Sequence, residues 1–344
     1  MAERNYLRNY WYVAATSAEV TRQPMRRWLC NEPVVLFRRQ DGTPAALNDR
    51  CPHRKFPLSA GVMVGDDIQC NYHGARFSGD GSCTVIHGEK RIAPGFRATS
   101  YPVLEKYKLV WIWMGDAEKR DESLIPADWE LNDHPDWTTV FGYHHVKGNY
   151  LLMLDNVLDL THVAYVHPTT LSSPQVFDAP NKVEVEGDEI RSLRITYNAD
   201  TPPLFRAAKG LGSKIDRWQK LHFTLPSNML GDMRGYPPGT NDINEAFRYC
   251  VLNSFTPETD GSCHYFWSVA RMFARDDGSV SRLLQEGVTK AFDEDCGVIV
   301  KQQEMIETDK SGTPMANFKA DEGGVAMRRI IARKLAEELS GGTA

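Results

Sequence analysis

Cys51-Pro52-His53, with Cys70-Asn71-Tyr72-His73-Gly74 after sixteen intervening residues, is the stretch that decides the fold of this chain. Each of the two motifs carries one cysteine and one histidine. A Rieske [2Fe-2S] centre binds one iron through two thiolates and the other through two imidazoles. Zinc also accepts two Cys and two His, but zinc motifs usually pair Cys with Cys and His with His. We therefore predict that Cys51, His53, Cys70 and His73 bind a Rieske cluster, in preference to zinc or to a role as four unrelated core or surface residues.

Composition is that of a globular protein outside the nucleic-acid-binding and membrane classes. The 344 residues exceed the usual size of one hydrophobic core, and 42% are hydrophobic and 25% charged. A net charge of -5 gives no reason to expect nucleic acid as a partner. No apolar run reaches the roughly 18 residues of a membrane helix, and the N-terminus lacks the order of a signal peptide. We expect a cytoplasmic protein without membrane contact.

Two domains are predicted from the pattern along the chain. Residues 1–115 contain short strand-like runs separated by turns, such as 33–37, 45–47 and 109–113, which predicts an antiparallel β domain that carries the cluster. The polar stretch 115–123 suits a connection between domains. Residues 116–344 mix strand-like segments with helical patterns near 150–166, 281–307 and 323–339. The fold class is therefore α+β, with an antiparallel β domain over 1–115 and an α+β domain over 116–344.

A second metal site is expected after residue 150, because an electron relay needs an acceptor. Asp155, Asp159 and His162 fall at i, i+4 and i+7 on one face of a helix. His167 lies about 140° further round a regular helix, so one straight helix could not direct both imidazoles at one ion. A bend or an end of the helix before His167 would allow it, and Pro168 favours such an end. His162 and His167 are then candidates for a 2-His-1-carboxylate Fe(II) site, the alternative being two buried structural histidines.

Asp295 is the candidate for the carboxylate of this site. The segment with Leu284, Val288, Phe292 and Ile299 places apolar residues at steps of three and four, and Asp295 lies on the same stripe. Burying a carboxylate without a partner is costly, so an acid on a core-facing stripe usually binds a cation or strong donors. We predict Asp295 as the third iron ligand, and the alternative is an Asp buried against Arg.

With these residues in place, the chain resembles the oxygenase components of Rieske non-heme iron aromatic oxygenases, in particular the vanillate and dicamba O-demethylase and toluenesulfonate methyl-monooxygenase group. The resemblance runs from 9–14 through both cluster motifs, 109–113 and 155–167 to 256–259 and Glu294-Asp295. It implies the same ligands, namely Cys51, His53, Cys70 and His73 for one [2Fe-2S] cluster, and His162, His167 and Asp295 for one Fe(II) per chain. It also implies a helix-grip-like catalytic domain.

The resemblance further implies a homotrimer in which the cluster of one subunit lies next to the iron of its neighbour. Asp159 would then bridge the neighbour's His73 and the local His162, and Asn156 matches a family position close to the iron. Asn253 matches a position that contacts substrate in the dicamba enzyme, where it is His. Trp267 and Asn228 are further candidates for the substrate-binding wall, although core packing explains Trp267 equally well. His144, His145, His222 and His264 have no ligand spacing and are expected to be structural.

The activity implied by the resemblance is that of an oxidoreductase, a Rieske monooxygenase that uses O2. A separate NAD(P)H-dependent reductase of ferredoxin or flavin type would supply single electrons through the cluster to Fe(II), beside an aromatic acid substrate. We expect O-demethylation of a methoxybenzoate-type substrate in aromatic compound degradation. Aryl methyl hydroxylation and ring (di)hydroxylation are the alternatives. A Rieske electron-transfer protein would need only the first domain, and a zinc-binding interaction module would be colourless.

Overall fold

The computed structural model describes residues 5–173, 175, 179–209, 212–240, 242 and 246–341, and the chain forms two compact units. The N-terminal unit contains the chain up to Ile125 together with Thr256–Asp260. The C-terminal unit contains Pro126–Phe255 and the chain from Gly261 onwards. The predicted combination of an antiparallel β domain with an α+β domain is confirmed. The predicted boundary at 115/116 stays a prediction.

Small antiparallel sheets build the N-terminal unit in the part of it that is described. Strands β1 and β11 pair antiparallel, and Trp11 meets Trp113 edge to face at 5.5 Å between ring centroids. The first sheet has the order β1 (Trp11–Thr16), β11 (Leu109–Trp113), β10 (Val103–Lys106). The second has the order β2 (Met25–Leu29), β3 (Glu32–Arg38), β4 (Pro44–Asn48), β9 (Ser100–Tyr101). The third has the order β5 (Val62–Val64), β6 (Asp67–Gln69), β7 (Arg76–Phe77), β8 (Cys83–Val85).

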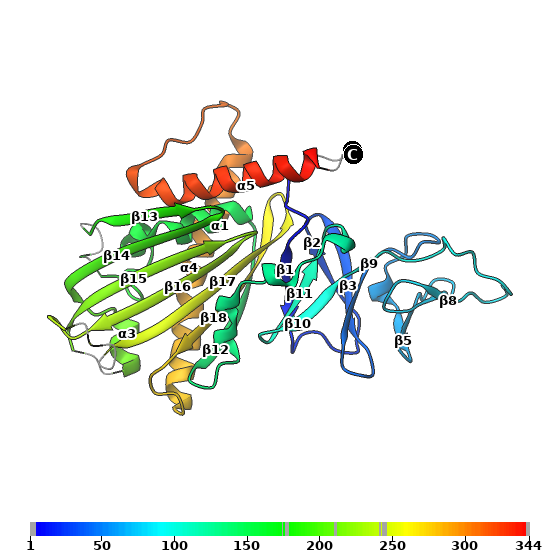
Figure 1. Cartoon of the computed structure of the whole chain (residues 1–344), viewed down its shortest axis with the longest axis horizontal. Helices are drawn as coiled ribbons and strands as arrows, with labels where there is room; N and C mark the ends of the chain where they lie inside the picture. Colours follow the sequence, from blue (N-terminus) through cyan, green and yellow to red (C-terminus); the bar gives the residue numbers. More distant parts are fainter. Residues whose placement is uncertain are drawn as a thin grey trace. The chain divides into compact units, whose positions relative to one another are not determined.

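A continuous antiparallel sheet of seven strands is the frame of the C-terminal unit (Figure 1). Consecutive strands are neighbours from β13 to β18. Strand β12 pairs with β18 and forms the edge of the sheet opposite β13. Side chains alternate between the two faces along each strand, so every second residue faces the same layer. The strands are β12 (Thr138–Val146), β13 (Asn181–Glu186), β14 (Glu189–Asp200), β15 (Lys214–Thr224), β16 (Asn228–Tyr236), β17 (Phe247–Thr259) and β18 (Ser262–Arg271).

Helix α4 is the long helix of the C-terminal unit and passes behind the strands in the view of Figure 1. Asp277 caps its N-terminus by accepting hydrogen bonds from the backbone N–H of Ser279 and Val280. Its buried stripe includes Leu284, Val288, Phe292, Asp295 and Ile299, as the sequence pattern predicts. The helices are α1 (Tyr150–Leu158), α2 (Val163–Val166), α3 (Pro203–Lys209), α4 (Gly278–Thr308) and α5 (Glu322–Ser340).

The expected strands at 33–37, 45–47 and 109–113 and the three expected helical regions are all present. Within the first helical region the helix is interrupted, as the placement of His167 requires. In the described part of the chain, no helix combines the length and the apolar character needed to cross a lipid bilayer.

Candidate metal centres and substrate cavity

The two cluster motifs form matching six-residue loops, 51–56 and 70–75. In each loop the first N–H donates to the last carbonyl, from Cys51 to Phe56 at 2.9 Å and from Cys70 to Ala75 at 2.8 Å. The fifth residue of each loop donates back to the first carbonyl from a positive φ, 59° at Lys55 and 77° at Gly74. This reversal turns Cys and His of one loop toward the same place. At Gly74 an added Cβ would also meet the His87 ring at 2.8 Å, so glycine suits the position.

The four predicted cluster ligands come together in the structure. The Nδ1 atoms of His53 and His73 are 3.2 Å apart, and both imidazoles are exposed to solvent. The two cysteines are only 2% exposed and lie in the hydrophobic core. Burial raises the pKa of the Cys51 thiol to about 11, and contact with Cys70 adds to the increase. Two buried sulfurs and two exposed ring nitrogens are the donor set that a Rieske cluster needs, so the residues fit this cofactor.

A break in the helical chain positions the two histidines of the second centre. Helix α1 ends at Leu158, and Asp159 adopts an extended conformation with φ -111° and ψ 98°. A short turn, Leu160–His162 (η5), and α2 follow, and His167 ends α2 with φ -116° and ψ 47°. The carboxylate of Asp159 caps the turn by accepting from the N–H and the hydroxyl of Thr161.

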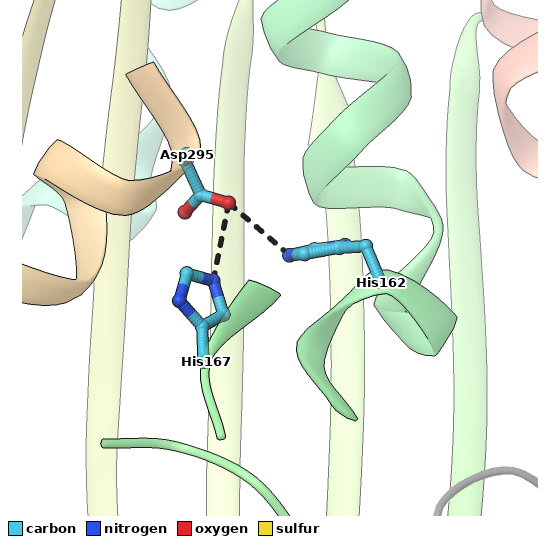
Figure 2. A group of neighbouring side chains, drawn as sticks. All are labelled: His162, His167 and Asp295. Atoms are coloured by element: carbon cyan, nitrogen blue, oxygen red, sulfur yellow. Dashed lines mark ion pairs between the residues drawn. The ribbon is translucent and has the colours of Figure 1, made fainter. Parts of the chain in front are cut away.

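Asp295 reaches the two imidazoles from α4, and Figure 2 shows the three side chains pointing toward one another. Its Oδ1 lies 3.4 Å from Nε2 of His162 and 3.1 Å from Nε2 of His167. One ligand atom from each residue lies within 4.8 Å of the other two. Two neutral imidazoles and one carboxylate are the ligands of non-heme Fe(II) centres, so the arrangement fits a mononuclear iron.

Groups around this triad orient its members. Nδ1 of His162 lies 2.5 Å from the backbone carbonyl of Asp159, and the amide of Asn156 donates to Oδ1 of Asp295 at 3.2 Å. Burial lowers the pKa of His162, and the nearby Asp295 offsets only part of this effect. For His167 burial acts the same way but is outweighed by Asp295 and then Glu294, so its pKa is raised.

Glu294 is a residue of this site that the sequence analysis missed. Its Oε2 lies 2.8 Å from Nδ1 of His167 and accepts a hydrogen bond from the Thr170 hydroxyl at 3.2 Å. A carboxylate on the far nitrogen of a ligand histidine fixes the tautomer and raises the basicity of the ring. The sequence pattern places Glu294 off the apolar stripe of α4, and its position next to Asp295 was the only available signal.

Asp155 does not contact the triad, although it shares the predicted helical face with His162. Its carboxylate accepts hydrogen bonds from Nε of Arg328 on α5, at 3.1 Å to Oδ1 and 3.0 Å to Oδ2. Helix α5 approaches α1 closely at Gly324, where an added Cβ would lie 2.9 Å from Oδ1 of Asp155. Asp155 therefore ties α1 to α5 and supports the helix that precedes the iron ligands.

A cavity opens on the triad within the C-terminal unit. It encloses about 740 Å³ of space not filled by atoms, including its mouth. Most of its wall is aliphatic or aromatic, and it includes Phe292 and the pair Phe205 and Tyr249, which stack at 4.2 Å between ring centroids. An apolar cavity with a few converging polar groups is the usual form of a small-molecule site. His162, His167, Asp295 and Asn156 all belong to its wall.

The three substrate-binding candidates have different positions. Asn253 lines the cavity, but its amide already accepts from the Tyr265 hydroxyl at 2.7 Å and donates to the Met229 carbonyl at 3.4 Å. Trp267 is fully buried but does not line the cavity, and its indole N–H donates to Nδ1 of His144 at 3.1 Å. Asn228 is also buried away from the lining. Their roles in substrate binding stay predictions.

Two further polar residues of the wall, Arg217 and Gln219, were not identified from the sequence. Both are on β15, where every second residue from Ile215 to Phe223 is buried. A cation and an amide within such an alternating apolar face were the signal that could have identified them.

Comparison with known proteins agrees with both centres. The Rieske [2Fe-2S] domain family matches residues 10–104, and the Vanillate O-demethylase oxygenase C-terminal domain family matches residues 146–337. The toluene-4-sulfonate monooxygenase system iron-sulfur subunit of Comamonas testosteroni is 36% identical over 98% of this chain and 99% of that protein. The vanillate O-demethylase oxygenase subunit of Pseudomonas sp. (strain HR199 / DSM 7063) is 35% identical over 96% of this chain and 95% of that protein.

Among solved structures, dicamba monooxygenase bound to 3,6-dichlorosalicylic acid matches with a TM-score of 0.92 and 34% identity, over 96% of this chain and 98% of that one. Another structure of dicamba monooxygenase contains non-heme iron. This chain belongs to the vanillate O-demethylase oxygenase family of Rieske non-heme iron oxygenases. It is an oxidoreductase, the oxygenase component of a multicomponent system, with one Rieske cluster and one mononuclear iron per chain as cofactors.

Proposed function

We propose that this oxygenase component oxidises a substituted aromatic acid, and that its reaction is O-demethylation of a methoxybenzoate-type substrate. The observation that carries the proposal is the cavity, because its aromatic and aliphatic wall adjoins His162, His167 and Asp295 directly. An aromatic ring in this cavity would lie beside the iron ligands and would be shielded from water. The vanillate and dicamba relatives are O-demethylases by name, which supports this reaction.

In this proposal Cys51, Cys70, His53 and His73 hold the cluster, and His162, His167 and Asp295 hold the iron. When bound, these groups supply one-electron transfer and coordination positions for dioxygen beside the substrate. Asn156 orients the carboxylate of Asp295, and Glu294 orients the imidazole of His167, through their hydrogen bonds. The apolar wall excludes water from the space next to the iron ligands.

We also propose the partners and the assembly that the family resemblance implies. A separate NAD(P)H-dependent reductase of ferredoxin or flavin type supplies the electrons, and the chain forms a homotrimer in the cytoplasm. Asp159 then connects the neighbouring subunit's cluster to the local iron site. Support within this chain comes from the position of Asp159. Its backbone carbonyl lies beside Nδ1 of His162, and the charge of its carboxylate raises the pKa of that ring, although burial outweighs this effect.

Hydroxylation of an aryl methyl group is the second candidate reaction. Subunits of the toluene-4-sulfonate monooxygenase system are as similar to this chain as the O-demethylases are, at 36% identity against 35%. The lining residues do not distinguish a methyl-substituted from a methoxy-substituted ring, so the two reactions are separated by their products.

The test is turnover of the reductase-coupled protein with 4-methoxybenzoate and, in parallel, toluene-4-sulfonate. O-demethylation releases one formaldehyde per substrate consumed and leaves a phenol, whereas methyl hydroxylation gives a benzylic alcohol without formaldehyde. Asp295→Ala is the inactive control, and Asp293→Asn is its matched neighbour, because Asp293 contacts His144 at 3.2 Å and not the triad. Conversion of toluene-4-sulfonate alone would replace O-demethylation by the second candidate.

A further inference from the structure

Arg217 and Gln219 form a buried polar pair in the otherwise apolar wall of the cavity. They are two residues apart on β15 and therefore share one face of the sheet. Arg217 is 6% exposed and Gln219 is 2% exposed, and both line the cavity. A guanidinium group placed this deep beside apolar side chains requires an explanation, because burying a charge is costly.

Neither side chain has its hydrogen-bonding capacity filled by the described residues. Nη1 of Arg217 and Oε1 of Gln219 are buried without a hydrogen-bond partner. Arg217 contacts the hydroxyl of Tyr249, whose pKa burial raises to about 12, so this partner is neutral. Among the ion pairs of the described residues, none involves Arg217, whereas buried cations in proteins are normally paired with an acid.

A second buried cation, Arg194, lies on the neighbouring strand. Arg194 on β14 is the register partner of Gln219, and it is 3% exposed with Nε and Nη1 unpartnered. Burial lowers the pKa of Arg194, Asp159 offsets part of this, and the charge of Arg217 lowers it further. This corner of the sheet thus holds two like charges that repel each other, with Asp159 near one of them. An anion bound at Arg217 would relieve the repulsion and would accept a hydrogen bond from Nη1 of Arg217, which has no partner.

We propose that Arg217, with Gln219 beside it, binds the anionic group of the aromatic substrate and makes the enzyme selective for aromatic acids over their neutral analogues. The inference rests on the proposed function, since Arg217 and the iron ligands share one cavity. The planar guanidinium fork matches the two oxygens of a carboxylate or a sulfonate. Gln219 can add a neutral hydrogen bond only by donating through its amide nitrogen, because the anion accepts and cannot donate. The rings of Phe205 and Tyr249 contact the aromatic body.

Asn253 is less suited to this task than Arg217. Both its amide oxygen and its amide nitrogen already have protein partners, in Tyr265 and Met229. Asn253 can offer an acid only the second N–H of its neutral amide, without a charge. Arg217 has an unused donor and a full charge, and both strengthen binding to an anion.

The test is binding without turnover, by calorimetric titration of the iron-replete protein under nitrogen with no reductase present. The probes are 4-methoxybenzoate, its neutral counterpart 4-methoxybenzamide, and toluene-4-sulfonate. Wild-type protein is expected to bind the preferred acid roughly 10- to 100-fold more tightly than the amide, as for a hydrogen bond to a charged group. Arg217→Met should lose this preference, and Arg217→Lys, which keeps the charge without the fork, should retain part of it.

Arg248→Met is the matched control. Arg248 lies on β17 of the same sheet, but it pairs with Asp232 at 2.9 Å and does not line the cavity. This variant removes the same charge and should keep the preference for the acid. Equal affinity of the wild type for acid and amide would overturn the proposal even if Arg217→Met did not fold, as would an unchanged preference in that variant. A clear preference for the acid without formaldehyde release in turnover would contradict O-demethylation alone.

Discussion

Replacing Glu294 by glutamine removes the charge that faces His167 and keeps the shape of the side chain. In the structure Oε2 of Glu294 lies 2.8 Å from Nδ1 of His167 and 3.2 Å from the Thr170 hydroxyl. The carboxylate accepts both hydrogen bonds, so it holds the ring with Nε2 directed toward Asp295. A glutamine can still accept through its amide oxygen, but it no longer polarises the imidazole.

The size of the effect follows from this contact. Loss of an outer partner of a metal-bound histidine typically weakens metal binding 10- to 100-fold, or about 1.4–2.7 kcal/mol. Because glutamine keeps one hydrogen bond, we expect Glu294→Gln to fall near the lower end, about tenfold, and Glu294→Ala near the upper end. The cluster is bound by other residues, so its content should not change in either variant.

The assay is iron retention during dialysis against a graded series of chelator concentrations. Mononuclear iron is measured as the iron in excess of the cluster, and the cluster is measured by its visible absorbance and EPR signal. Asp293→Asn is the control, since it removes a neighbouring charge that contacts His144 and not the triad. If Glu294→Gln and Glu294→Ala both held mononuclear iron as tightly as Asp293→Asn, the assignment of Glu294 as a positioning residue would be refuted.

The remaining predictions concern the subunit bridge, the support of α1, and pH. Asp159→Asn should retain both metal centres by iron analysis and lose most turnover. Full activity in this variant would contradict the proposed role of Asp159 as a bridge between the cluster and the iron. Asp155→Asn should lower the free energy of unfolding by at most about 1 kcal/mol in denaturant titration, because Arg328 loses its charged partner. The loss is small because the contact is partly exposed and because burial raises the pKa of Asp155 despite Arg328; no change would show that this contact is not stabilising. The hydrogen bond to Asp128 raises the pKa of His222 against the opposing effect of burial. Its contribution to stability is therefore full below the ordinary pKa of 6.5 and is lost as the pH rises through the raised value. His222→Asn should accordingly lower Tm more at pH 6 than at pH 9, and an equal loss at both would contradict this.

The candidate ligand residues that meet in the structure could be predicted from the sequence because the chemistry of metal binding restricts residue type and local spacing. Cys51 and His53, like Cys70 and His73, are close enough in the chain for one loop to present both. His162 and His167 required a break in the helix, and Pro168 indicated it. Asp295 was found through the cost of placing a carboxylate on a buried stripe.

The residues that the sequence analysis missed depend on contacts between distant segments. Glu294 acts on His167, 127 positions away in the chain, and helical periodicity alone places it off the buried stripe. Arg217 becomes notable only when the sheet and the cavity show that its guanidinium is buried without an acid. In the same way Asn253 is a plausible substrate contact by spacing, but the hydrogen bond from Tyr265 is visible only in three dimensions.

Total iron per chain in wild-type protein and in His167→Ala tests the central claim most directly, because it counts the two centres at once. We predict three iron atoms in the wild type, two in the cluster and one mononuclear, and two in the variant with the Rieske EPR signal unchanged. Two iron atoms in iron-replete wild-type protein, or three in the variant, would contradict a mononuclear iron bound by His162, His167 and Asp295.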